Sequence, residues 1–329
     1  MDEKQALLLS QYDMDIYRAM RMKGAWLLET DKGLKLFGTC PFGESKLAFE
    51  QKIKQQAREQ GFAAVDSYVK TKDGTYLVAG PYNEFFVMRD WFAGEECDVQ
   101  CAEHVLETVK TLAKLHRCLT GLSLAPEEEA FSKQAKLPEL LERRNRELRR
   151  VRSYIRSKKQ KSAFEQKFLS RFSLQYEQAE EAVGWLEGAE YEEDYQTALS
   201  RGTVAHGNFT HHSVILSESG IAVTGFHKAV VGLQIQDFYL LFRKMMEKRD
   251  WDADFGNAML TAYESIKPLT DRERKWMKVM LFYPEKFWKV ANQYYNNRKS
   301  WIPEKNMQKL IQTMEQAEKK EECIRSLFT

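Results

Sequence analysis

The stretch that decides the fold reads His206-Gly207-Asn208-Phe209-Thr210-His211-His212-Ser213-Val214-Ile215-Leu216. Its apolar end, a turn at 217–220 and the run Ile221-Ala222-Val223-Thr224-Gly225 predict two short strands joined by a turn. Apolar residues at helical spacing precede this hairpin and follow it. A strand pair inserted among helices is an unusual arrangement, and it draws attention to the His-Gly-Asn loop in front of it.

Helical patterns occupy most of the chain on both sides of the hairpin. Residues 102–116 keep apolar side chains on one helical face, which predicts a long amphipathic helix. Mainly helical sequence then runs over 126–201 and again from 236 onward. We therefore expect a large helical lobe over 95–329, with the loop and hairpin at 203–228 inside it.

The first ninety or so residues instead alternate strand and helix signals. The predicted strands cover 26–30, 33–37, 65–71, 75–79 and 84–91, and the predicted helix covers 45–60. Lys72-Asp73-Gly74 is a turn signal that predicts a hairpin between the third and fourth strands. Together these elements predict a small antiparallel sheet with one helix packed on it.

The order of these parts is typical of one architecture. A sheet-rich small lobe over 1–94, a hinge near 88–94 and a helical large lobe over 95–329 are expected of an α+β, protein-kinase-like two-lobed fold. A helical protein with a small α+β cap would fit the same pattern.

Composition narrows the class of protein. The 329 residues carry a net charge of +2 and are 43% hydrophobic, which provides a sizeable core and does not favour nucleic acid or an anionic membrane as a partner. The five cysteines have no spacing typical of disulfides or of zinc. Since no apolar run approaches about 18 residues, no membrane insertion is expected. We expect a soluble protein that stays in the cell where it is made.

The loop resembles the catalytic loop of small-molecule kinases, which reads H-G-D-x-x-x-x-N before an apolar strand. In that motif the Asp accepts the proton of the attacking hydroxyl, and the Asn holds a magnesium ion. A second Asp, delivered by the hairpin, is the principal magnesium ligand. At these three positions the chain carries Asn208, Ser213 and Gly225.

Those three replacements remove the groups that the chemistry needs. Asn208 cannot take up a proton, Ser213 is a shorter and weaker ligand, and Gly225 brings no side chain. Loss of a general base alone slows a reaction by roughly 10² to 10⁴. Loss of the metal removes charge stabilisation as well. We therefore expect no catalytic residue, no bound metal and no working kinase.

Other residues of the motif are expected to frame the loop or the nucleotide cleft. His206, Gly207 and Asp237 are interpreted as architectural, with Asp237 opening a helix and bracing the loop. In the small lobe, Lys35 and Glu50 are the candidates for the lysine–glutamate pair that holds nucleotide phosphates. The hinge residues Met88, Arg89 and Asp90 would complete that cleft. No cofactor is expected, and ATP would be the one to test.

Segments spread along the chain resemble one family. They are Thr30–Lys35, Met88–Gly94 with Glu96–Asp98, Leu112–His116, His206–Phe209 with His211–His212, and Tyr283–Trp288 with Tyr294–Asn296. The chain resembles the CotS-type spore coat kinase-like family, in its YutH branch, within the aminoglycoside and choline kinase-like superfamily. The resemblance implies a role in spore coat assembly, with other coat proteins as partners. It also implies synthesis in the cytoplasm followed by residence in the spore coat.

Two surface features remain. Ten Arg and Lys residues crowd the helical region Arg143–Lys161, which is either a solvated face or a docking surface for an acidic partner or polyanion. Aromatic residues are dense over 276–301, which favours core packing over a ligand site.

Two hypotheses about function follow. The first is a pseudokinase that serves as a structural or scaffolding component of the spore coat. The second is an atypical phosphotransferase that acts on a small molecule or a coat protein through His211, His212 or His227.

Overall fold

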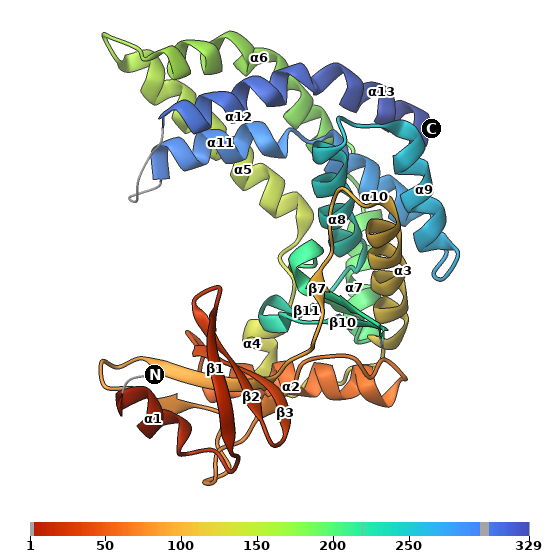
Figure 1. Ribbon diagram of the computed structural model, residues 1–329. Coiled ribbons are helices and arrows are strands. Elements are labelled where there is room, and N and C mark those ends of the chain that lie inside the picture. The colour runs from red at the N-terminus through yellow and green to blue at the C-terminus, as the bar shows by residue number, and fades with distance from the viewer. Residues whose placement is uncertain (1–2, 219, 297–302, 329) are drawn as a thin grey trace. The chain divides into compact units, whose positions relative to one another are not determined.

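The computed structural model describes residues 3–218, 220–296 and 303–328 (Figure 1). Its helices are α1 (Glu3–Leu9), α2 (Glu44–Glu59), α3 (Ala102–Cys118), α4 (Glu129–Ser132), α5 (Leu137–Ser157), α6 (Ala163–Gly184), α7 (Glu190–Ser200), α8 (Ile235–Lys248), α9 (Ala253–Glu264), α10 (Asp271–Phe282), α11 (Glu285–Asn296), α12 (Pro303–Glu315) and α13 (Ala317–Leu327). Its strands are β1 (Ile16–Met22), β2 (Ala25–Thr30), β3 (Gly33–Thr39), β4 (Tyr68–Val69), β5 (Val78–Ala79), β6 (Phe85–Asp90), β7 (Glu95–Glu96), β8 (Val204–Ala205), β9 (Val214–Ser217), β10 (Gly220–Val223) and β11 (Val230–Val231). The predicted aromatic segment ends at Trp301, which lies outside the described residues.

Six strands form the antiparallel sheet near the N-terminus. Its order is β1-β2-β3-β6-β4, and β5 pairs with β6 as well. The predicted turn between β2 and β3 is confirmed, because Thr30 pairs with Gly33 across it and Gly33 has the positive φ of +82° that glycine tolerates. Strand β1 adds an edge to the sheet that the predicted strands do not include.

The predicted hairpin between 65–71 and 75–79 is wrong in its pairing. A turn is present, since the Thr71 amide donates to the Thr75 carbonyl at 2.8 Å. The strands themselves are two residues each, and both pair with β6 instead of with one another. Strand β3 pairs with one edge of β6. On the other edge, β4 pairs with Met88 and Arg89 and β5 pairs with Phe85 and Phe86.

The two faces of this sheet are covered by different elements. Phe37 and Met88 pack on the face covered by α1 and Tyr12. Val87 belongs to a second cluster with Leu47 of α2. Because successive side chains of a strand point to opposite faces, this assignment fixes which residues of β3 and β6 can reach α2.

A second set of short strands holds the His-Gly-Asn loop. The predicted hairpin is present as β9 and β10, with β7 added beside β9. Strand β8, which precedes the loop, and strand β11, which follows the hairpin, pair with each other in an antiparallel ladder. Backbone contact ties the hairpin to the segment after α2, since the Val223 amide donates to the Ala64 carbonyl at 2.9 Å.

Internal contacts divide the chain into two compact units. The first comprises Met1–Lys133 and Leu199–Asp237, and so contains the sheet together with the loop and hairpin. The second comprises Gln134–Ala198 and Phe238–Thr329 and is helical. The predicted lobe limits, 1–94 and 95–329, stay a prediction.

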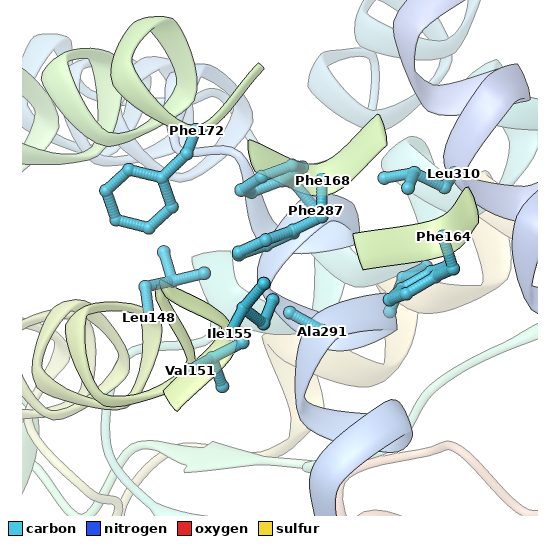
Figure 2. Packing of buried hydrophobic residues seen from close by; sticks show 10 residues of the cluster. Leu148, Val151, Ile155, Phe164, Phe168, Phe172, Phe287, Ala291 and Leu310 are labelled. Atoms are coloured by element: carbon cyan, nitrogen blue, oxygen red, sulfur yellow. The ribbon is translucent and has the colours of Figure 1, made fainter. Parts of the chain in front are cut away.

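The helical unit has an aromatic core. Figure 2 shows Phe168 of α6 lying against Phe287 of α11, and their rings are parallel with centroids 4.8 Å apart. Leu148 of α5 and Leu310 of α12 complete the same buried cluster. Part of the aromatic segment at 276–301 therefore serves core packing, as its density predicts.

Candidate functional site: the His-Gly-Asn loop and the sheet beside it

Asp237 holds the backbone of the His-Gly-Asn loop. Its carboxylate accepts hydrogen bonds from the His206 amide at 2.5 Å and from the Gly207 amide at 2.8 Å. It also lies 3.3 Å from Nε2 of His116 in α3. The side chain is 2% exposed, so these contacts compensate a carboxylate that would otherwise be costly to bury. The loop-bracing contact expected of Asp237 is present.

His206 has an architectural position. Its ring is fully buried, and Nδ1 accepts a hydrogen bond from the Asn208 amide at 3.4 Å. Nε2 therefore carries the proton and donates to the Thr224 carbonyl at 3.0 Å. Burial lowers the pKa of His206, because the charged form loses its hydration. A neutral ring with both nitrogens in use links the loop to the end of β10.

Both the backbone conformation and the surrounding atoms require a glycine at position 207. Its φ is +77°, and a Cβ built there would lie 2.0 Å from the carbonyl oxygen of Lys228. Every side chain larger than hydrogen would push the loop away from that backbone.

The three expected degenerate positions gather around one turn. Ser213 Oγ donates to the Asn208 carbonyl at 3.2 Å and accepts from the Thr210 amide at 3.2 Å. The Ser213 carbonyl accepts a hydrogen bond from the Thr224 amide at 2.8 Å, and Gly225 is the residue that follows Thr224. The hydroxyl of Ser213 is thus used within the loop. The site presents an amide, a hydroxyl and a bare backbone in place of two carboxylates and an amide.

Open space surrounds Gly225. It has a φ of +85°, and a Cβ built there meets no atom within 4 Å. Among the described residues, no group of three or more His, Cys, Asp or Glu side chains is arranged to hold a metal ion.

The neighbouring histidines have defined surroundings. Nδ1 of His212 lies 2.7 Å from the Glu96 carboxylate, which also pairs with Lys23 in the turn between β1 and β2. His211 packs against His212, with ring centroids 3.9 Å apart. Burial lowers the pKa of His227, whose ring lies against Phe42.

Lys35 does not pair with Glu50, so that part of the prediction is wrong. Lys35 stands opposite Asp90 in the β3–β6 ladder, and its ammonium lies 2.9 Å from the Asp90 carboxylate. Both residues are on the face of the sheet that α1 covers, with Phe37. Glu50 belongs to α2 on the opposite face, so strand alternation keeps the two apart.

The face that looks toward α2 carries different residues. Leu36 and Gly38 of β3 and Arg89 of β6 line a hollow of about 250 Å³ beneath the turn at Lys23 and Gly24. Leu36 occupies one of the β3 positions on this face, and position 38 is the next one at which a lysine could stand. A Cβ at position 38 would lie only 3.1 Å from the Cβ of Ala25, so the strand has no room for one without a shift. Of the predicted hinge residues, Arg89 reaches this hollow, whereas Met88 and Asp90 point to the other face.

Glu50 forms an ion pair with a lysine of its own helix, α2. Its Oε1 lies 2.7 Å from Nζ of Lys54, and its Oε2 accepts a hydrogen bond from the Tyr68 hydroxyl at 2.8 Å. Lys54 in turn lies 3.2 Å from Asp66, and Asp66 lies 3.5 Å from Arg89. We call these four charged residues, Glu50, Lys54, Asp66 and Arg89, the buried charge cluster.

The buried charge cluster adjoins the loop and was not among the predicted site residues, apart from Glu50 and Arg89. Lys54 is fully buried and lies 5.8 Å from the ring of Phe226, the residue after Gly225. Two carboxylates and two cations compensate one another in the space between the sheet, α2 and the hairpin. The formal charges of these four side chains sum to zero.

Comparison of sequences relates the chain to spore coat proteins. The family described as "Spore coat putative kinase YutH" matches residues 5–327. "Spore coat protein S" of Bacillus subtilis (strain 168) is 24% identical over 282 residues, which cover 85% of this chain and 80% of that protein. No helix in the described part of the chain is long and apolar enough to cross a membrane.

Solved structures share the fold at low identity. An aminoglycoside phosphotransferase from Alicyclobacillus acidocaldarius is 20% identical, with a TM-score of 0.85 over 98% of this chain and 94% of that one. A spectinomycin phosphotransferase bound to ADP and spectinomycin is 10% identical, with a TM-score of 0.64 over 97% and 99%. These likenesses confirm the expected α+β, protein-kinase-like two-lobed fold. The family match across nearly the whole chain identifies the protein as a member of the spore coat kinase-like family of the YutH type.

Proposed function

We propose that the protein is a pseudokinase with a structural or scaffolding role in spore coat assembly. The observation that supports this most directly is the set of Asn208, Ser213 and Gly225 around a loop whose frame is intact. Asn208 offers no base for a substrate hydroxyl, and no carboxylate stands at either metal position. Loss of the base and of metal-assisted charge stabilisation together removes most of the rate enhancement that a phosphotransferase needs.

The sheet side of the cleft supports the same proposal. Position 38, on the face toward α2, is a glycine, and the one lysine beside Glu50 is already paired with two carboxylates. Lys54 is fully buried and also lies 3.2 Å from Asp66, so a phosphate could reach its ammonium only if this contact and the packing around it opened.

The family and the named relative supply the cellular setting of the proposal. Membership in a spore coat family and similarity to "Spore coat protein S" favour residence in the coat after synthesis in the cytoplasm. We propose that the partners are other coat proteins, reached through the basic region Arg143–Lys161. Nucleic acid and membrane insertion are not part of the proposal.

Calorimetric titration of the purified protein with ATP, with and without Mg²⁺, tests it. Absence of binding in both titrations supports a purely structural role. Binding that does not depend on the metal identifies a nucleotide-sensing pseudokinase. Tight binding that requires Mg²⁺, accompanied by turnover of a coat protein or small molecule, overturns the proposal and favours the phosphotransferase hypothesis.

A further inference from the structure

In the basic region Arg143–Lys161, some cationic side chains pack against neighbouring helices and others are exposed to solvent. The Arg144 guanidinium lies 4.3 Å above the ring of Trp288, and Arg152 lies 4.7 Å above Phe172. Both are engaged inside the helical unit, because each covers a ring of a neighbouring helix. The region is therefore only partly available for docking.

Lys158 pairs with Glu165 at 2.6 Å, and neither it nor Lys161 is fully exposed. The other six cations form an exposed surface on α5 and just beyond it, which we call the arginine face. Its members are Arg143, Arg146, Arg149, Arg150, Arg156 and Lys159. Two exposed carboxylates of α5 accompany them: Glu142, at 3.7 Å from Arg146, and Glu139, one turn before Arg143. Within the described residues, the other members make no ion pair. The whole chain has a net charge of only +2, so this face concentrates positive charge that the rest of the surface lacks.

A groove runs beside the arginine face, between α5 and α11. It encloses about 400 Å³, and Arg150, Tyr154, Trp288 and Tyr295 are among its lining residues. Tyr154 is 54% exposed and meets Tyr295 edge-on, with ring centroids 5.1 Å apart. The Trp288 indole N–H donates to Glu147 at 2.7 Å, which fixes that ring in the wall. The groove thus has rigid aromatic walls and a cation at its rim.

Helical geometry assigns the arginines to two sides of α5. Residues seven and eleven positions apart on an α-helix lie close to one line, so Arg143, Arg150 and Tyr154 follow the groove side. Arg149 and Arg156 lie about a third of a turn away, toward the side on which Arg152 contacts α6. Arg150 lines the groove and Arg143 lies about two turns away on the same side of α5, whereas Arg149 and Arg156 form a matched pair, also exposed, on another side.

We propose that the groove and its two arginines bind an acidic segment of another protein, with one large aromatic side chain of that segment in the groove. Carboxylates on either side of the ring would pair with Arg143 and Arg150. The proposal rests on the scaffolding function proposed above, since it names the chemistry of the partner. Charge complementarity argues for an acidic ligand, and the ring-lined groove argues for an amino-acid side chain within it.

The surface favours a protein segment over nucleic acid. Single-stranded nucleic acid is held by several exposed rings that stack on successive bases. On the described part of α5, Tyr154 is the one exposed large apolar side chain. A single ring beside a groove provides one anchor, which suits a peptide better than a base stack.

A titration of the full chain with a fluorescent peptide tests the proposal. The probe is a peptide of about twelve residues in which Glu and Asp surround one central Phe. The groove-side variant carries Arg143→Glu and Arg150→Glu, and the control carries Arg149→Glu and Arg156→Glu, which is the same charge change on the same helix. We expect binding to weaken about tenfold or more in the groove-side variant and no more than about threefold in the control.

A second probe separates the groove from charge alone. Replacing the central Phe of the peptide by Ala is expected to weaken binding about tenfold to the unchanged protein. It should have little effect on binding to a Tyr154→Ala variant, whose groove has lost a wall. Equal losses in the two arginine variants, or a peptide whose ring makes no difference, would mean general attraction of anions and would overturn the proposal.

Other occupants give distinct results. Tighter binding of a short single-stranded DNA or of anionic phosphatidylserine vesicles than of the peptide, lost in the groove-side variant, overturns the proposal in favour of those ligands. Self-association of the free protein that only the groove-side variant abolishes identifies a second copy of the chain as the occupant. The ATP titration tests nucleotide binding at the His-Gly-Asn loop, and the peptide titration tests binding in the groove. A negative result in one experiment therefore does not decide the other.

Discussion

Glu50 and Lys54, four residues apart on α2, form a fully buried ion pair in which Oε1 lies 2.7 Å from Nζ. In an active kinase the helix glutamate holds a lysine that reaches over from a strand. Here the lysine comes from the same helix, and Asp66 and Arg89 extend the contact to the strand side. The pair therefore ties α2 to the sheet without a nucleotide.

Removal of one cation from this cluster is expected to destabilise the protein strongly. Lys54→Met keeps the length of the side chain but leaves Glu50 and Asp66 buried beside only one cation, Arg89. Breaking a buried pair from one side lowers the free energy of unfolding by about 3 to 5 kcal/mol. Urea unfolding followed by circular dichroism measures the change.

Lys52→Met is the matched control on the same helix. Lys52 pairs with Glu128 at 2.7 Å, but its side chain is 39% exposed. Exposed pairs contribute about 1 kcal/mol or less. If the two substitutions change the free energy of unfolding equally, the buried charge cluster does not hold α2 as we describe.

Restoring the lost side chains is expected to restore some metal-dependent binding. The triple variant Asn208→Asp, Ser213→Asn and Gly225→Asp returns two carboxylates and an amide to the loop. Position 225 has room, since its Cβ would meet no atom within 4 Å, although its φ of +85° strains any residue with a side chain. We expect ATP affinity that requires Mg²⁺, measured by calorimetry.

The single variant Gly225→Ala controls for that backbone strain, because it introduces a side chain without a carboxylate. It should fold slightly less stably and bind no Mg²⁺–ATP. If the triple variant folds as well as this control yet gains no affinity, the assignment of the three positions is mistaken or the buried charge cluster closes the cleft to phosphates.

The loop could be predicted from the sequence because a short motif marks it. His206 and Gly207 are adjacent, and Asp237, in the first turn of α8, accepts hydrogen bonds from both of their amides. The hairpin strands β9 and β10, which follow the loop, are also predicted from their apolar runs and the turn between them.

The lysine assignment could not be made in the same way. A shift of one residue in strand register moves a side chain to the other face, so Lys35 could not be placed by its type alone. Lys54 reads as half of an ordinary exposed Glu–Lys pair on a helix. One signal could have identified it, because Leu47, Glu50, Lys54 and Ala57 share the same helical stripe and so predict burial of both charges together.

Gly207→Ala is expected to be far more harmful than the same change at a comparable turn. The new Cβ would lie 2.0 Å from the Lys228 carbonyl oxygen, so the loop must move off its hydrogen bonds to Asp237. Gly33→Ala is the control, because Gly33 has a similar φ of +82° and open space around it. Strain alone costs about 1 to 2 kcal/mol. Denaturation of both variants should show a clearly larger loss for Gly207→Ala, and equal losses would contradict the close approach.

The helical unit is expected to lose stability in acid through Glu285. Burial alone would raise the pKa of this carboxyl, but the guanidiniums of Arg243 and Arg144 outweigh burial and lower its pKa from 4.5 to about 2. The Glu285 carboxylate lies 3.5 Å from Arg243 and 3.6 Å from Arg144, and it accepts the Tyr239 hydroxyl at 2.5 Å. These contacts favour the ionised form in the folded state.

The sign of the pH dependence follows from that shift. The folded pKa lies below the unfolded one, so the stabilisation is complete above about pH 4.5 and is lost as the pH falls toward 2. Between about pH 5 and pH 3, Glu285 should account for a loss of about 2 kcal/mol in the free energy of unfolding. Glu285→Gln will be less stable at neutral pH, because the guanidiniums of Arg144 and Arg243 both lose a carboxylate partner. Its stability should nevertheless fall less steeply over this range, as measured by urea unfolding at a series of pH values. A variant with the same acid slope as the unchanged protein would assign the acid sensitivity to other carboxyls.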